Sequence, residues 1–437
     1  MSDKPDGTYP YCSQSFYPHI YSLSSLHRSC LNPRSMCRLE TMNRRSFVRR
    51  IGLACGGLSP LATRYERLRA QLAASVANPQ NKYDAASVAP SLGGSACNLP
   101  PVHVENDRVM RTVVGLRPYR PSGFVVRAEK VDDKLVIHNY GHGGAGITLS
   151  WGTSQLALQL GCSGHMGPVA VMGCGAVGLA TARLLQESGF KVTIYSKTLP
   201  PDTTSDAAGG AWTPFLVGDP AKLDSQFSRQ LLLASGFAHK RYLSMLGDQF
   251  GVRWVRSYTI SKTAFDESSV IGTQSMFRSM RPEFRDLTPA EHPFSADCAV
   301  RQFDTLLIEP PKYLQAMMHA FREAEGTIVV KTIADRAAIA QLQENLIFNC
   351  TGLGSKDLFP DDELMPARGQ LTFLKPQPEV LYAVSHDELY MLPRADGIVL
   401  GGTYELGETS LTPDKKKMRV ILAKHKAFFD SYRHVKC

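Results

Sequence analysis

The segment from Pro168 to Ser196 restricts the fold more than any other part of the chain. It opens with an apolar run, Val169 to Met172, that has the character of a buried strand. Three glycines follow in the spacing Gly-x-Gly-x-x-Gly, namely Gly173, Gly175 and Gly178. Residues 176–188 then alternate apolar and polar at helical spacing, and residues 191–195 again resemble a strand. This order of elements predicts an α/β fold with a Rossmann-like parallel sheet that binds a dinucleotide.

The three glycines have separate physical roles in such a turn. Gly173 permits the tight turn, Gly175 lets backbone N–H groups approach a pyrophosphate, and Gly178 lets the helix pack closely on the strand. The first residues of the helix, Ala176 and Val177, bring the partial positive charge of its N-terminus to the phosphates. We therefore expect these five residues to form the cofactor-binding turn.

The residues after the second strand leave the identity of the dinucleotide open. An acidic residue there normally binds the ribose hydroxyls, whereas this chain has Ser196 and Lys197. Lys197 by itself favours a ribose 2′-phosphate, and hence an NADP-dependent dehydrogenase as an alternative function. A glycine turn without any ligand is the structural alternative.

The net charge of the chain is concentrated near its N-terminus. The whole sequence carries a formal +9, and residues 1–77 hold 11 Lys and Arg against 4 Asp and Glu, which leaves +2 for the remainder. This distribution argues against a nucleic-acid-binding face. No stretch reaches the roughly 18 apolar residues of a membrane span, and the ten cysteines show no metal-ligand spacing. We expect no nucleic-acid partner, no stable membrane insertion and no metal site.

Residues 1–77 form a predicted leader. Asn43 to Arg50 reads NRRSFVRR and resembles a twin-arginine export signal, and a short apolar run, Ile51 to Ala62, follows it. A basic arm is the alternative interpretation. If the signal is used, translation starts at Met42 and the export machinery carries the protein to the periplasm; otherwise the protein is cytoplasmic. Residues 78–100 are rich in Asn, Pro, Ser, Gly and Ala and predict a linker.

The segment Asp202 to Phe215, DTTSDAAGGAWTPF, follows the second strand. Its first hydroxyl groups offer phosphate ligands, on Thr203, Thr204 and Ser205. The small residues after them leave a backbone that a flat ring system can approach, at Gly209, Gly210 and Ala211. This segment resembles the one that wraps the flavin in the D-amino-acid oxidase family.

Further motifs of that family follow along the chain. Leu346 to Gly352 (LIFNCTG) resembles the segment that returns the chain to the dinucleotide, with Thr351 and Gly352 against the cofactor. Arg368-Gly369-Gln370 resembles the next motif, and Tyr390 to Arg394 resembles the strand that carries the active-site tyrosine.

Two family motifs are present but displaced. Val114 to Arg120 reads VGLRPYR, and Val136 to Gly152 reads VIHNYGHGGAGITLSWG. In the family these motifs close the chain, whereas here they precede the glycine turn. The difference is a single rotation of the motif order, which predicts a circular permutation with residues 159–168 as the joining loop. Such a rearrangement is tolerated where the original termini lie close together on the surface.

The resemblance implies FAD-dependent oxidation of D-amino acids or related amines by hydride transfer to flavin N5. Imino or 2-oxo acids and hydrogen peroxide would be released, with oxygen as the acceptor. It places a carboxylate-binding arginine at Arg117, a substrate-binding tyrosine at Tyr390 and a carbonyl that contacts the substrate amine at Gly144. It also places four residues against the flavin, namely Gly143, Gly146, Ile147 and Thr148. Thr148 would support the negative charge of the reduced ring.

Two histidines lie within or near these motifs. The lid tyrosine of the family would fall at His386, so we expect a different lid and substrate range. His386 is then either a site residue that admits a more polar substrate or a solvated loop residue. His142 lies in the glycine-rich turn at residues 138–146, and we interpret it as a structural residue rather than a base.

These observations predict a Rossmann-like FAD-binding parallel sheet with a mixed-sheet substrate-binding domain, as in D-amino-acid oxidase. Residues 101–437 form this oxidoreductase. Its FAD-binding parts fall at about 136–218 and 330–372, and its substrate parts at about 101–135, 220–330 and 373–410. A homodimer is compatible with this organisation, and an exported flavin-binding protein without turnover is a further alternative.

Overall fold

The computed structural model of the chain describes residues 92, 95–265 and 277–435. The twin-arginine motif and the rest of the leader lie outside these residues, as does most of the linker predicted at 78–100. Across the described ranges, no helix combines the length and the apolar character that crossing a membrane requires.

One sheet is mainly parallel. Within the described residues it has six strands, in the spatial order β2 (Val125–Val131), β3 (Lys134–Tyr140), β10 (Leu346–Asn349), β4 (Val169–Met172), β5 (Val192–Ser196) and β9 (Thr327–Val330). All neighbours run parallel except β2, which forms an antiparallel hairpin with β3. Every residue of β4 and β10 is buried, as expected for central strands covered on both faces. At the carboxyl end of β4, Met172 lies between Tyr195 and Asn349, so the loops after β4, β5 and β10 meet at one edge.

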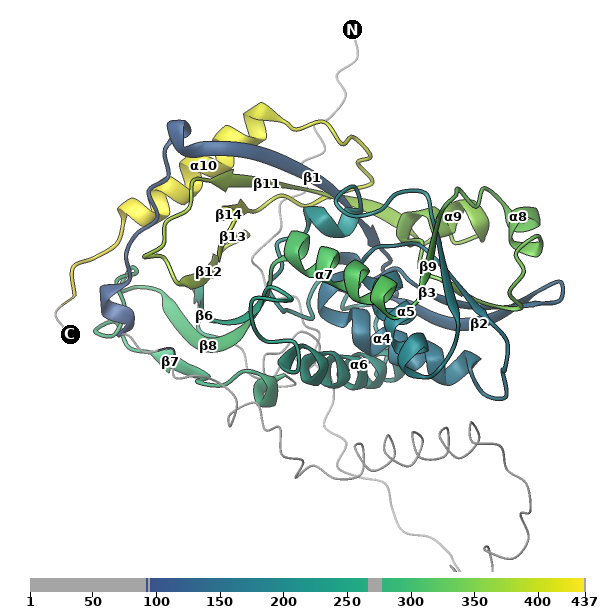
Figure 1. Cartoon of the computed structure of the whole chain (residues 1–437). Coiled ribbons are helices and arrows are strands. Elements are labelled where there is room, and N and C mark those ends of the chain that lie inside the picture. Colours follow the sequence, from purple (N-terminus) through teal and green to yellow (C-terminus); the bar gives the residue numbers. More distant parts are fainter. Residues whose placement is uncertain (1–91, 93–94, 266–276, 436–437) are drawn as a thin grey trace, which may run out of the picture. The chain divides into compact units, whose positions relative to one another are not determined.

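The second sheet is mixed. Its strands lie in the order β1 (Val109–Tyr119), β11 (Met365–Leu374), β14 (Gly397–Gly401), β13 (Leu389–Arg394), β12 (Tyr382–His386), β6 (Val252–Ser261), β8 (Ala299–Ile308) and β7 (Arg285–Leu287), with β15 (Glu405–Leu406) beside β11. The β6–β12 pair is parallel and the other pairs are antiparallel. In Figure 1 the long strand β1 lies beside β11 and extends toward the parallel sheet.

The helices pack in two groups. Their bounds are α4 (Gly146–Gly161), α5 (Ala176–Glu187), α6 (Ser225–Leu243), α7 (Pro310–Glu323), α8 (Arg336–Ala340), α9 (Ser355–Leu358) and α10 (Lys415–Asp430). Helix α5 contacts α4 and α7, and α4 also contacts α6, next to the parallel sheet (Figure 1). Helix α10 instead lies along the mixed sheet, where Phe428 stacks on His386 of β12.

The apolar face of α5 determines how this helix packs on the parallel sheet. Leu179 and Leu185 are fully buried in one cluster with Val171 of β4 and Ile194 of β5. Burying one such side chain contributes about 1.5–3 kcal/mol, so this cluster fixes α5 against the sheet. The N-terminus of α5 is thereby held at the edge where the glycine turn leaves β4.

The secondary structure predicted around the glycine turn is confirmed, with boundaries that differ by one residue. The predicted strands are β4 and β5, and the predicted helix is α5. Strand pairing assigns three segments differently from the predicted parts of the fold. One is β9, which pairs with β5 in the parallel sheet although 220–330 was expected in the substrate part. Strand β2 joins the parallel sheet although 101–135 was expected in the substrate part, and β11 joins the mixed sheet although 330–372 was expected in the FAD part. Pairing between strands decides this, since β2 turns directly back onto β3 and β11 pairs with the distant β1.

Candidate functional site

A cavity of about 1340 Å³ lies where the loops of the parallel sheet face the mixed sheet. It exceeds the roughly 300–1,000 Å³ of pockets for drug-sized ligands, so a dinucleotide and a small substrate can share it. The predicted site residues that line it are Arg117, Gly143, Gly144, Gly146, Ile147, Thr148, Gly173, Gly175, Ala176, Val177, Thr203, Thr204, Ser205, Gly209, Gly210, Ala211, Thr351, Gly352 and Tyr390. Gly178 does not line it. A Cβ at Gly178 would collide with the carbonyl oxygen of Gly173, so this glycine allows the close packing of α5 on the turn.

The glycine turn after β4 has the geometry that a phosphate-binding turn requires. Gly173 has φ +101°, a left-handed conformation that side chains other than hydrogen disfavour. A Cβ at this position would lie 2.5 Å from the carbonyl oxygen of Cys350. Helix α5 begins directly afterwards, and the Ala176 N–H donates to the Ser205 hydroxyl at 3.0 Å. The turn therefore presents a helix N-terminus, with a hydroxyl beside it, to the cavity.

The segment after β5 forms a wall of small residues. It begins with the short helix η4 (Thr204–Ala207), where the hydroxyl of Thr203 donates to Asp206 Oδ2 at 2.7 Å. A Cβ on Gly210 would collide with the carbonyl oxygen of Ile308, and Gly210 has φ +98°. This backbone can thus approach β8 closely and leave the cavity side open.

The second glycine-rich segment leads into α4 rather than remaining a turn. Residues 138–140 belong to β3, the short helix η3 (Gly143–Ala145) follows, and α4 begins at Gly146. The predicted turn is therefore shorter, and Gly146, Ile147 and Thr148 form the first turn of a 16-residue helix. Because a helix N-terminus carries partial positive charge, this end of α4 favours negative charge in the cavity.

Two side chains near this segment are already engaged with protein groups. The Thr148 hydroxyl donates to the Thr213 carbonyl at 3.3 Å and lies 3.2 Å from the Thr213 N–H. His142 is buried, lies 2.8 Å from the Thr153 hydroxyl through Nε2, and stacks on Phe124. Burial lowers the pKa of His142 to about 3, so the ring is neutral, as expected for a structural residue.

Arg117 reaches the cavity from β1 because Gly369 leaves room for it. A Cβ on Gly369 would lie 2.6 Å from Arg117 Cζ and closer still to both terminal nitrogens. The guanidinium lies 5.9 Å from the ring centroid of Tyr404, and its buried Nη1 has no hydrogen-bond partner. A forked cation with an unused donor is therefore available to a carboxylate.

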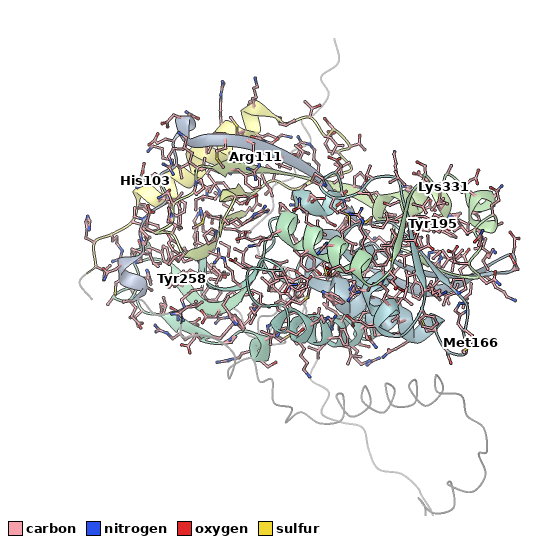
Figure 2. The ribbon with its side chains drawn as sticks, in the orientation of Figure 1. His103, Arg111, Met166, Tyr195, Tyr258 and Lys331 are labelled. Atoms are coloured by element: carbon pink, nitrogen blue, oxygen red, sulfur yellow. The ribbon has the colours of Figure 1, made fainter. Side chains whose placement is uncertain are left out.

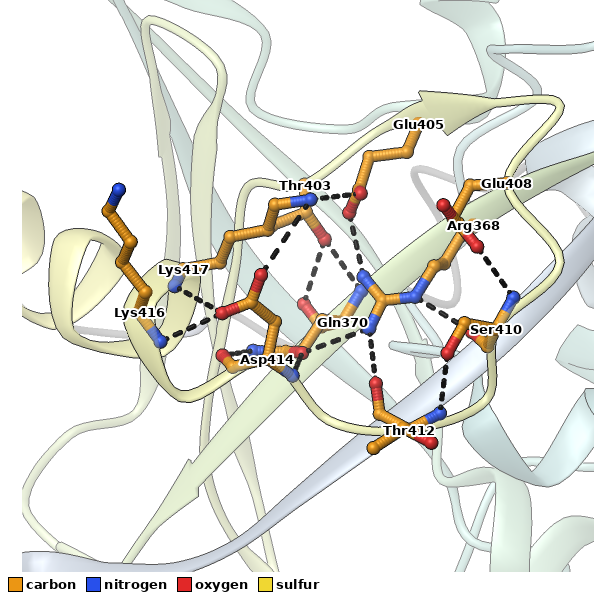
Figure 3. Close-up of polar contacts among 10 residues, drawn as sticks. All are labelled: Arg368, Gln370, Thr403, Glu405, Glu408, Ser410, Thr412, Asp414, Lys416 and Lys417. Carbon is orange, nitrogen blue, oxygen red and sulfur yellow. Dashed lines mark hydrogen bonds and ion pairs between the residues drawn. The ribbon is translucent and has the colours of Figure 1, made fainter.

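The neighbours of Gly369 tie β11 to the segment before α10 (Figure 3). Arg368 is buried and donates to the carbonyls of Ser410 at 2.8 Å and Thr412 at 2.7 Å, and it pairs with Glu405 at 2.7 Å. Gln370 accepts from the Asp414 N–H at 2.7 Å. Side chains alternate along a strand, so Arg368 and Gln370 hold the structure while Gly369 faces the other side, toward Arg117.

Tyr390 lies on β13 and lines the same cavity. Its ring packs against two glycines, since a Cβ on Gly401 would collide with the ring atom Cζ and one on Gly209 would lie 3.8 Å from the hydroxyl. The phenol is thereby placed beside the small-residue wall.

Neither expectation for His386 agrees with the structure. The side chain is 7% exposed, does not line the cavity, and stacks on Phe428 with ring centroids 3.7 Å apart. It therefore belongs to the interface between β12 and α10, and burial lowers its pKa to about 4. The residues that line the cavity at this turn are its neighbours Ser385, Asp387 and Glu388.

The structure adds cavity residues that were not predicted from the sequence. Arg281 and Asn139 line the cavity and are buried, and the Asn139 Oδ1 has no partner. Tyr195 and Lys331 lie together at one edge of the parallel sheet (Figure 2), where the Lys331 N–H donates to the Ser196 carbonyl at 2.9 Å. Arg281 comes from the region at about 220–330, which carries no recognisable motif, so only its position in space reveals it.

Comparison with known proteins shows the family of the chain. The family model for FAD-dependent oxidoreductases named DAO matches residues 168–436. The chain belongs to this family. It is therefore an FAD-dependent oxidoreductase, and FAD is its cofactor, so the NADP alternative suggested by Lys197 is not supported.

Among similar proteins is a D-amino-acid oxidase from Dictyostelium discoideum, 28% identical over 265 residues, which are 58% of this chain and 70% of that protein. A D-amino-acid oxidase from Streptomyces coelicolor is 29% identical, covering 59% of this chain and 76% of the relative. A human D-aspartate oxidase is also 29% identical, over 59% of this chain and 74% of that relative. Among solved structures, glycine oxidase from Geobacillus kaustophilus aligns with a TM-score of 0.46 and 15% identity, covering 61% of this chain and 80% of that one.

The residues around the cavity fit FAD. The glycine turn closes over Cys350 with no space for a side chain at Gly173, and a helix N-terminus adjoins it. Small residues line one wall, and the cavity volume exceeds that of a drug-sized ligand site. A long ligand with a diphosphate and a flat ring matches these features.

Proposed function

We propose that this protein oxidises D-amino acids, or closely related amines, to imino acids that hydrolyse to 2-oxo acids, with release of hydrogen peroxide. The observation that carries the proposal is the Arg117 guanidinium, which offers an unpaired donor within the cavity that holds the glycine turn. The names of the relatives, which are D-amino-acid and D-aspartate oxidases, support the substrate class.

The chemistry that FAD supplies when bound is acceptance of a hydride, with the electrons passed on to oxygen. In our proposal the diphosphate is held by the turn from Gly173 to Val177, and by Thr203, Thr204 and Ser205. Gly209 to Ala211 and Gly146 to Thr148 would hold the flavin ring. Thr351, Gly352 and Gly143 complete this binding surface.

The protein groups orient the substrate. Arg117 binds the α-carboxylate in a forked arrangement, Tyr390 contacts it through the phenol, and the Gly144 carbonyl accepts from the amine. Orientation of this kind matters because a displacement of roughly 1 Å can cost about a hundredfold in rate.

Helix α4 would stabilise negative charge on a bound flavin. Ile147 and Thr148 lie in its first turn and line the cavity, so the positive end of the helix dipole is at the cavity. The Thr148 hydroxyl is bound to the Thr213 backbone, so we give the backbone amides of α4 the larger part of this role.

We also propose that the chain is a circular permutation of the family order. The family match begins at residue 168, yet β1, β3 and α4 lie before it and contribute to both sheets and to the cavity. The loop that follows α4 leads directly into β4, where the permutation would join the original ends. Export by the twin-arginine route, a homodimer, and the division at residues 77 and 100 stay predictions.

The decisive experiment is anaerobic mixing of the purified, flavin-containing protein with a panel of D- and L-amino acids. Loss of visible flavin absorbance with D-amino acids only, followed by peroxide formation when oxygen is admitted, would support the proposal. Reduction by L-amino acids instead would contradict the stereochemistry. A flavin that no amino acid or amine reduces would contradict the oxidase function and favour a flavin-binding protein without turnover.

A further inference from the structure

Arg281 is a buried cation without a partner. It follows the short helix η5 (Arg278–Met280) and its side chain is 1% exposed. None of its three guanidinium nitrogens has a hydrogen-bond partner. Burial lowers the pKa of this guanidinium to about 10, which still leaves it charged at neutral pH.

Other buried arginines of the described chain have carboxylate partners. Arg368 pairs with Glu405 at 2.7 Å, and Arg394 pairs with Asp396 at 2.7 Å. A buried charge is costly unless it is paired and hydrogen-bonded. A buried arginine without a protein partner therefore indicates that a bound ligand supplies the negative charge. Arg281 therefore differs from the arginines that hold the fold together.

The position of Arg281 links this charge to the substrate. It lines the same cavity as Arg117 and Tyr390. Its Cζ lies 4.4 Å from the ring centroid of Phe303 and 5.1 Å from that of Phe215. These are cation–π contacts, and the rings provide no conventional hydrogen-bond acceptor for its N–H groups.

Phe215 connects Arg281 to the substrate end of the cavity. The next residue, Leu216, accepts from the Gly144 N–H at 3.0 Å through its carbonyl. Gly144 is the residue whose carbonyl we propose to contact the substrate amine. Arg281 thus contacts the segment that binds Gly144.

We propose that Arg281 binds the side-chain carboxylate of the substrate, which makes acidic amino acids the preferred class. This inference rests on the proposed function. The α-carboxylate would occupy Arg117 and the second carboxylate would occupy Arg281, each in a forked, charge-assisted arrangement. A neutral amide of the same shape offers only one acceptor oxygen and leaves the positive charge uncompensated.

The rim of the cavity also carries acidic groups, but they do not cancel this preference. Asp387 and Glu388 are exposed, and Asp387 lies 3.6 Å from Lys262. Charges in contact with solvent are screened, whereas the buried Arg281 is screened much less.

The first test compares substrates of equal shape on the flavin-containing enzyme. We expect kcat/KM for D-aspartate to exceed that for D-asparagine by about tenfold to a hundredfold, and D-glutamate to exceed D-glutamine likewise. Arg281→Met should remove most of this ratio, because kcat/KM should fall more for the acids than for the amides of the same shape. Arg281→Lys should keep part of it, since the charge remains but the fork is lost.

Arg278→Met is the matched control. It removes the same charge three residues away, from an exposed side chain that packs on Phe284 and does not line the cavity. The acid-to-amide ratio should therefore stay as in the wild-type enzyme. A ratio that is near one in the wild type, or that survives in Arg281→Met, overturns the inference.

Equilibrium binding separates this inference from the proposed function. Calorimetry with succinate and propionate on the flavin-containing protein should show about tenfold or more tighter binding of the dicarboxylate, and Arg281→Met should abolish the difference. If no amino acid is oxidised but this pattern is found, the oxidase proposal fails and the anion site stands. If D-alanine is oxidised but succinate binds no better than propionate, the anion site fails and the oxidase proposal stands. These wild-type comparisons decide the question even if Arg281→Met loses its flavin.

Discussion

Replacing Gly369 by alanine should displace the Arg117 guanidinium while leaving the protein folded. The new Cβ would lie 2.6 Å from Arg117 Cζ, whereas ordinary contact begins at 3.4 Å. The guanidinium must therefore move by roughly 1 Å, a displacement that can cost about a hundredfold in an oriented complex. The movement itself is inexpensive because the group lies at the end of a flexible side chain.

The expected effect is on substrate binding. Charge-assisted hydrogen bonds contribute about 1.5–3 kcal/mol, which corresponds to about a 10- to 100-fold rise in KM for carboxylate substrates. Arg117→Leu should raise KM at least as strongly, with FAD still bound. Because both changes act on one group, the double variant should be no worse than Arg117→Leu alone.

Steady-state oxygen consumption with D-alanine measures KM, and flavin absorbance measures FAD content. Gly236→Ala is the control, since it adds the same methyl group on α6, where the nearest heavy atom would be Met280 Cε at 3.5 Å. An unchanged KM in Gly369→Ala, or additive effects in the double variant, would refute the placement of Arg117 at the carboxylate.

Three other changes test further parts of the structure. Gly173→Ala places a Cβ 2.5 Å from the Cys350 carbonyl oxygen, at a residue with φ +101°. We therefore expect the purified variant to contain little FAD, measured as the ratio of flavin to protein absorbance. Full FAD occupancy would contradict the role of this turn in cofactor binding. Arg368→Met removes the donors to Ser410, Thr412 and Glu405, and should lower the free energy of unfolding in urea by about 3–5 kcal/mol; a loss below about 1 kcal/mol would contradict the role of this network. Burial lowers the pKa of His386 to about 4 in the folded protein, whereas the same side chain has a pKa near 6.5 in the unfolded chain. As the pH falls, His386 therefore binds a proton in the unfolded chain first. Stability should thus be lost between about pH 6.5 and 4, by up to about 2 kcal/mol at pH 5. Burial also lowers the pKa of His239 and His425 to about 4 and that of His142 to about 3, so His386 supplies one part of the total loss. His386→Phe keeps the stacked ring and should reduce the loss of unfolding free energy between pH 7 and pH 5 in urea titrations; an unreduced loss would show that His386 does not contribute to it.

The sequence determined the features that depend on neighbours along the chain. Apolar runs around Gly173 and Gly175 were enough to predict β4, α5 and β5, because strand, turn and helix chemistry act within a few residues. The family resemblance assigned residues 209–211 and 146–148 to the flavin site, and the structure shows that both segments line the cavity. Arg117 and Tyr390 came from motifs whose roles follow from a family resemblance, and the structure places both side chains in one cavity.

The tertiary structure decided what depends on contacts between distant segments. Arg117 reaches the cavity because Gly369, on another strand, leaves space for it, and no local pattern shows that space. His386 faces α10 rather than the cavity because Phe428 offers an aromatic surface some forty residues away in the chain. Arg281 lies in a segment without motifs, and only the folded chain shows that its charge is buried, unpaired and turned to the site. Pairing and desolvation are properties of three-dimensional neighbours, so a sequence pattern limited to nearby residues cannot express them.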